Sequence, residues 1–112
     1  MGTLRVLEQR RIKRLRTKIL REVASGHVDD GVLLARETLR RYPDEVGLWL
    51  LLETVLAFDD DRGENLAERE GVLRDGLDSV PGDVRLRVNL IDVLSAEGKI
   101  EEADALLDEL AA

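Results

Sequence analysis

Residues 26–31 read GHVDDG and residues 98–103 read GKIEEA, and both follow one pattern of glycine, polar, β-branched, acidic, acidic and small residue. The glycines that open the two stretches are 72 positions apart, and the chain's two prolines, Pro43 and Pro81, are 38 apart. Both spacings fit a period of about 34 residues if four extra residues lie between the prolines, and the polar run at 59–64 is the place for them. The chain is therefore predicted to be an array of structural repeats.

Apolar residues recur three or four positions apart along most of the chain, which is typical of amphipathic helices, and no long stretch alternates as a strand would. Pro43 and Pro81 are expected to end helices, and Asp44 and Asp83 to cap the helices that follow. Gly98 is expected to supply the left-handed residue that commonly ends a helix. We therefore predict six helices: one along the stripe Ile12, Leu15, Ile19 and Val23, extended by Leu4 and Leu7, and five at about 28–41, 45–58, 63–79, 83–96 and 100–110.

Several of these residues resemble the motif of the tetratricopeptide repeat, which reads W-x₂-L-G-x₂-Y in its first helix and A-x₃-F in its second. The matching positions are Trp49, Leu52 and Leu56, then Leu90 and Leu94, then Ala103 and Leu107, with Pro43 and Pro81 in the closing proline slot. The departures are Glu53 where Gly is usual, Arg87 in the Trp slot, Arg69 where a small residue packs, and Lys18 and Glu22 in apolar slots.

The resemblance implies an all-α, right-handed helix–turn–helix solenoid of three repeats, at about 12–45, 46–83 and 84–112. Residues 1–11 are then expected to form a basic helical extension that continues into the first helix. Because one helix pair buries too little apolar surface alone, neighbouring repeats would stack into one continuous core. The chain stops without an additional capping helix, so part of the last helix is expected to stay uncovered.

Composition argues against catalysis, metal binding and a membrane span. Cysteine is absent, which excludes thiolate chemistry, and His27 is the only histidine. We therefore predict no enzyme activity, cofactor or metal. The acidic run Asp59–Asp61 is similar to the start of a calcium loop, but Glu64 stands at the sixth position, where such loops need Gly. The longest apolar run, 48–52, is far shorter than the roughly 20 residues of a membrane span. With no apolar signal segment, we expect a cytoplasmic protein.

The resemblance also implies a concave groove lined by the first helix of each repeat. The candidate groove residues are Arg16 and Leu20 from the first repeat, Leu50, Leu51, Thr54 and Phe58 from the second, and Arg85, Val88, Asn89 and Asp92 from the third. A clamp for chaperone C-termini is disfavoured, because Leu20 and Leu51 occupy slots that would need asparagine. The apolar centre favours a peptide or amphipathic helix of another protein. The alternative is that Leu50, Leu51 and Phe58 are ordinary core; an acid at Leu51 would then unfold the chain instead of only weakening binding.

Charge is distributed unevenly along the chain. Residues 1–21 hold eight basic groups and one acid, a net +7, whereas residues 22–112 carry −14. The basic patch comprises Arg10, Arg11, Lys13, Arg14, Lys18 and Arg21. Three interpretations stay open: a solvated face that balances acids such as Glu22, Asp29 and Asp30; a docking surface for an acidic protein or the acidic C-terminal repeat of another copy; or a site for nucleic acid or anionic lipid.

The sequence thus predicts a non-enzymatic protein-interaction module or scaffold. A homodimer through the uncapped C-terminal helix is a parallel hypothesis. Nucleic-acid binding through the basic first helix is the alternative, and it is disfavoured by the acidic remainder and by the lack of aromatic residues before Tyr42.

Overall fold

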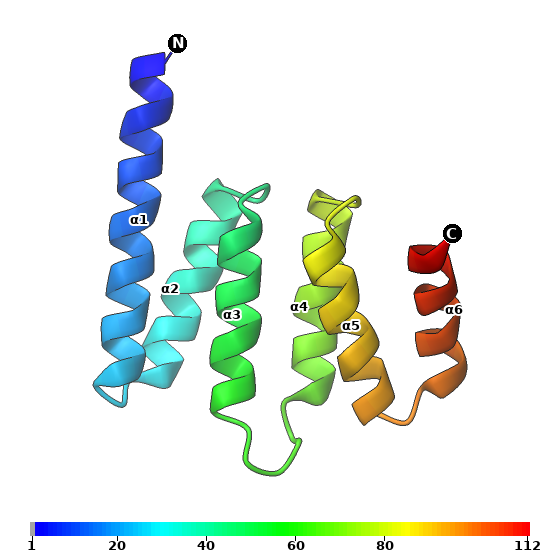
Figure 1. Ribbon diagram of the computed structural model, residues 1–112. Coiled ribbons are helices and arrows are strands. Elements are labelled where there is room, and N and C mark those ends of the chain that lie inside the picture. The colour runs from blue at the N-terminus through cyan, green and yellow to red at the C-terminus, as the bar shows by residue number, and fades with distance from the viewer. Residues whose placement is uncertain (1) are drawn as a thin grey trace.

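The computed structural model describes residues 2–112 and confirms the predicted all-α helical-repeat architecture. These residues form six helices and no strand. Figure 1 shows the helices side by side in chain order, with each running opposite to the one before it. Their bounds are α1 Gly2–Ala24, α2 Val28–Arg41, α3 Val46–Phe58, α4 Leu66–Ser79, α5 Val84–Ala96 and α6 Ile100–Ala111.

Packing between successive helices builds the core, and α3 also touches α5. One cluster of buried side chains joins α1, α2 and α3 with Val72 of α4, and a second joins α4, α5 and α6. Trp49 contacts both clusters, so it links the two halves of the array. Its indole lies against Gly76 of α4, where an added Cβ would come 3.1 Å from the ring. Trp49 therefore packs between the two helices of its own repeat.

The turns at the two matching hexapeptides have the same backbone geometry. Gly26 and Gly98 adopt φ angles of +86° and +80°, in the left-handed region that glycine enters without a steric cost. In both turns the next residue donates its backbone N–H five residues back, from His27 to Glu22 and from Lys99 to Leu94, each at 2.8 Å. This 6→1 hydrogen bond satisfies a carbonyl that the helix end leaves free. The left-handed residue predicted at Gly98 is confirmed.

Equivalent side-chain contacts also recur from one repeat to the next. The indole Nε1 of Trp49 donates to the Pro43 carbonyl at 2.6 Å, and the guanidinium of Arg87 donates to the Pro81 carbonyl at 2.9 Å. Arg87 thus takes over the hydrogen bond of the Trp slot that it occupies. Two ion pairs, which we call rungs, join successive second helices: they are Arg36–Glu68 and Arg74–Glu102.

Two predicted boundaries need correction. Glu45, not Asp44, precedes α3, and no side chain caps that helix, whereas Asp83 accepts the predicted capping bond from the Leu86 N–H at 3.0 Å. The fourth helix begins at Leu66 instead of residue 63. The amide side chain of Asn65 donates to the Leu56 carbonyl at 3.0 Å, which keeps the inserted residues in a loop.

Glu53 on α3 and Arg69 on α4, which both depart from the repeat motif, form an ion pair with each other. Arg69 donates from Nε and Nη2 to Oε1 of Glu53, at 3.1 and 3.0 Å. Glu53 is buried and Arg69 is half-buried. A carboxylate at the usual Gly position is therefore accommodated because a guanidinium replaces the usual small residue opposite it.

None of the helices in residues 2–112 has the length and apolar character that crossing a membrane requires.

Candidate interaction surfaces

The solvent-facing side of α3 carries no charge. Glu53 is the helix's one charged residue, and it is buried and paired. Phe58, at the end of the helix, leaves 75% of its surface exposed. Solvent-facing sides of helices are ordinarily polar, so an uncharged side with an exposed aromatic ring is unusual for a monomer. This uncharged face consists of Gly47, Leu50, Leu51, Thr54 and Phe58.

The groove candidates on this face differ in burial. Leu51 is half-buried against the first core cluster, and Leu50 is half-buried against the second. Both therefore stabilise the fold as well as facing outward. Thr54 and Phe58 are exposed and contribute little to the core. An acid at Leu51 would disturb packing, so Phe58 is the better position at which to test binding without unfolding the chain.

The neighbouring first helices flank α3 with further candidates. The guanidinium of Arg16 lies beside Gly47, within 3.6 Å of where a Cβ would stand, which places α1 next to the uncharged face. Leu20 on α1 and Val88 on α5 are 51% and 42% exposed. Arg85 and Asp92 are exposed, and Asn89 is half-buried. The structure thus surrounds the apolar centre with a few charged groups.

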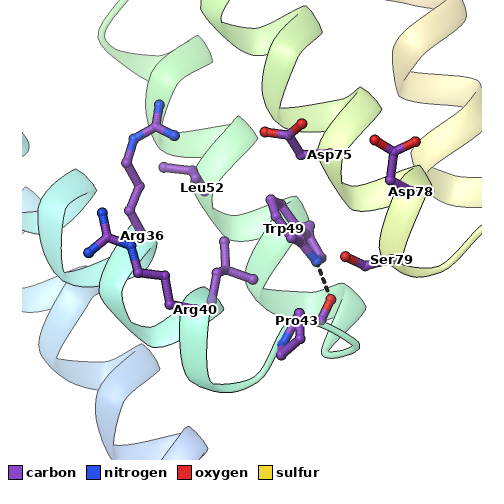
Figure 2. Close-up of a pocket in the computed structure, with 9 residues that line it drawn as sticks. Arg36, Arg40, Pro43, Trp49, Leu52, Asp75, Asp78 and Ser79 are labelled. Atoms are coloured by element: carbon purple, nitrogen blue, oxygen red, sulfur yellow. Dashed lines mark hydrogen bonds between the residues drawn. The ribbon is translucent and has the colours of Figure 1, made fainter.

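A hollow of about 430 Å³ opens between α2, α3 and α4, and sequence reasoning did not predict it. Figure 2 shows Trp49 between two arginines of α2 and two aspartates of α4. The sequence feature that could have predicted this hollow is the opposite charge of α2 and α4 on either side of Trp49. A similar hollow follows between α4, α5 and α6, around Arg87 in the equivalent slot. The feature is a product of repeat stacking, and we assign it no ligand. Its lining comprises Arg36, Leu39, Arg40, Pro43, Trp49, Leu52, Asp75, Asp78 and Ser79.

The basic patch of α1 is exposed to solvent. No cation of Arg5–Arg21 forms an ion pair with an acid in the part of the chain that the structure describes. Glu22, one of the acids expected to balance the patch, instead accepts from His27, with 3.2 Å between Oε2 and Nδ1. Exposed apolar side chains accompany the cations: Leu4, Val6 and Leu7 are each more than half exposed.

A polar network fastens the last turn of the array to α4. Oε1 of Glu70 lies 2.6 Å from Lys99 Nζ, and Arg74 Nε donates to its other oxygen at 2.8 Å. Lys99 first and Arg74 second lower the pKa of Glu70 from 4.5 to about 2. Burial raises the pKa of Glu97, and the neighbouring carboxylate of Glu70 raises it further. The network is structural, because it joins α4 to the α5–α6 turn.

His27 lies beside two acidic side chains. One carboxylate oxygen each of Glu22 and Asp30 and a ring nitrogen of His27, which are potential metal ligands, lie within 4.8 Å of one another. The His27 side chain is 61% exposed, and its hydrogen bond to Glu22 explains the arrangement. The acidic run Asp59–Asp61 also forms a local hydrogen bond: Asp60 accepts from the Asn65 N–H at 3.1 Å.

Comparison with known proteins adds no family to these findings. No protein-family model matches the chain, and no curated protein matches it significantly. The tetratricopeptide resemblance therefore continues to depend on the residues and contacts given above.

Proposed function

We propose that the protein is a non-enzymatic interaction module of tetratricopeptide type that binds an apolar peptide or amphipathic helix of another protein. The proposal depends on one observation, the uncharged and partly exposed face of α3. A cytoplasmic location is part of the same proposal.

The proposed mechanism is docking onto a preformed surface. The helices that hold the face are packed on both core clusters, so binding would require little ordering of the backbone. Phe58 would be covered by the partner's apolar side chains, because an exposed aromatic ring provides much of the binding energy in such contacts. Arg16 and Arg85 at the margins would orient acidic groups of the partner.

A peptide-display selection with matched variants tests this proposal. Peptides of about 20 residues would be selected on the wild-type protein and then measured against F58Q and L33Q by fluorescence anisotropy. Leu33, on α2, is 56% exposed and lies outside the uncharged face, so it is the control. We expect F58Q to weaken binding at least about 10-fold and L33Q to leave it unchanged. Selected peptides that bind F58Q as tightly as wild type would refute the proposed face.

A second candidate function is binding of nucleic acid or another polyanion through α1, and the unpaired cations there favour it. Labelled single-stranded RNA and DNA would be titrated with wild type and with a variant neutralised at Arg10, Arg11, Lys13 and Arg14. If this candidate is correct, affinity falls steeply with salt and is lost in the variant. No measurable affinity at about 50 mM salt would remove it.

A further inference from the structure

The two ends of the array each present a helix face that inner helices keep covered. Inside the array, the second helix of one repeat packs on the first helix of the next, as α2 does on α3 and α4 on α5. Within residues 2–112, α6 has no such helix after it and α1 has none before it. Figure 1 places these two helices at opposite ends of the row.

The outward face of α1 is cationic at positions that the inner repeats fill with leucine. Leu48 and Leu52 of α3 are fully buried. The residues one 34-residue period earlier are Arg14 and Lys18, and both are exposed. Spacings of four, four and three residues put four cations on one side of the helix. This cationic face comprises Arg10, Arg14, Lys18 and Arg21.

The outward face of α6 has the opposite charge. Residues 100–111 contain five acids and no cation. Three of the acids lie three and four positions apart, so they share one side of the helix, and all are exposed. Ile100 and Leu107 beside them are 52% and 53% exposed. This acidic face comprises Glu101, Asp104 and Asp108.

We infer that the cationic face of α1 binds the acidic face of α6 in a second copy of this chain. The inference goes beyond the proposed function, because it uses the ends of the array and not the face of α3. Charges on the far side of the molecule contribute little, since the molecule measures 44 × 36 × 17 Å and the screening length at 0.15 M salt is about 8 Å. Local complementarity therefore outweighs the repulsion expected from a net charge of −7 on each copy.

The interface has two further properties. It is heterologous, so each copy keeps one free end and assembly continues beyond a dimer unless a ring closes. It involves one helix on one helix, a small contact of the weak and transient class. Association is therefore expected at tens of micromolar to millimolar concentration and not below.

The rungs show that the second copy does not continue the array in register. Asp108 occupies the position equivalent to Arg36 and Arg74, and Asp30 occupies the position equivalent to the glutamates of the rungs. In-register stacking would bring Asp108 against Asp30 of the next copy, two like charges. An arginine at 108 would form an ion pair with Asp30 of the next copy in the in-register arrangement, but it would repel the cationic face of α1. The variant D108R therefore distinguishes the two geometries.

Sedimentation velocity between about 10 μM and 1 mM tests the inference. The head variant carries R10Q, R14Q and K18Q. The tail variant carries E101Q, D104N and D108N. All six positions are exposed, so both variants should fold, and circular dichroism checks this. We expect wild type to gain mass with concentration at 50 mM salt, with about 10- to 100-fold weaker association at 500 mM salt or in either variant alone.

An equimolar mixture of the two variants provides the decisive measurement. Each variant keeps one intact end, so the mixture should form dimers and nothing larger at concentrations where each variant alone is monomeric. D108R should associate more weakly than wild type. Three results would each overturn the inference: a wild type that is monomeric at 1 mM, a mixture that remains monomeric, or a D108R variant that associates more tightly.

Discussion

The buried ion pair between Glu53 and Arg69 gives the sharpest test of how the fold tolerates its departures from the repeat motif. Glu53 is 5% exposed, and both of its hydrogen bonds with Arg69, at 3.1 and 3.0 Å, use a single oxygen. Removing Arg69 would leave a buried carboxylate without its partner, which typically costs about 3–5 kcal/mol. The Arg69 side chain keeps 21% of its surface exposed, so water can reach the site, and we expect about 2–3 kcal/mol for R69A.

A double-mutant cycle separates the pair from the rest of the packing. In E53A the guanidinium of Arg69 can turn toward solvent, so we expect a smaller loss of about 1 kcal/mol. The double variant restores small residues of the kind the motif uses and leaves no unpaired charge, and its cost should be about 1–2 kcal/mol. The double variant should therefore lose about 2 kcal/mol less than the sum of the two single variants.

Urea denaturation followed by circular dichroism measures all four proteins at pH 7. The slope of unfolding free energy against urea should be the same for each, which shows that the native and unfolded states are comparable. Costs that add within about 0.5 kcal/mol would refute the reasoning, because the two residues would then act independently. An R69A protein as stable as wild type would refute it as well.

Further substitutions test the packing and the polar network, all by urea or thermal unfolding. G31A should destabilise by about 1 kcal/mol because its Cβ would come 2.8 Å from a valine methyl of α1, whereas G71A, with nothing within 4 Å, should gain about 0.5–1 kcal/mol. W49F should lose about 1–3 kcal/mol with its hydrogen bond and ring volume. L51D should unfold more readily than wild type, because Leu51 supports the core. The pKa of Glu70 is about 2 in the fold against 4.5 ordinarily, so its ionised carboxylate stabilises the fold above pH 4.5 and loses that contribution as pH falls toward 2. The difference in unfolding free energy between wild type and E70Q should therefore become smaller from pH 4.5 to pH 2.

The helices could be predicted because glycine and proline mark their ends. Pro43 and Pro81 restrict the backbone, whereas Gly26 and Gly98 adopt the left-handed conformation that other residues avoid, and both effects are local and need no tertiary contact. The start of the fourth helix was misplaced because it depends on Asn65, whose amide reaches back nine residues to a backbone carbonyl of α3. A bond of that range is decided by how the loop folds, not by local propensity.

The pairing of Glu53 with Arg69 could not be predicted from the motif, although both residues were singled out. A motif compares each position with its own usual occupant, so two departures count as two mismatches. Only the packing of α4 on α3 shows that they compensate one another. The same holds for Glu70 and Lys99, which are 29 positions apart and meet where the α5–α6 turn approaches α4.

The departures on α1 have a different cause, and their lack of partners is what distinguishes them. Lys18 and Arg14 stand where inner repeats bury leucine, yet they are exposed because no helix precedes α1 within residues 2–112. An end repeat requires a polar outward face, but uncharged or mixed polar residues would satisfy that requirement. A helix that concentrates cations of one sign and leaves them unpaired has more charge than an end cap needs. Paired departures such as Glu53 therefore serve the fold, whereas the unpaired ones of α1 mark the surface on which a partner should be sought.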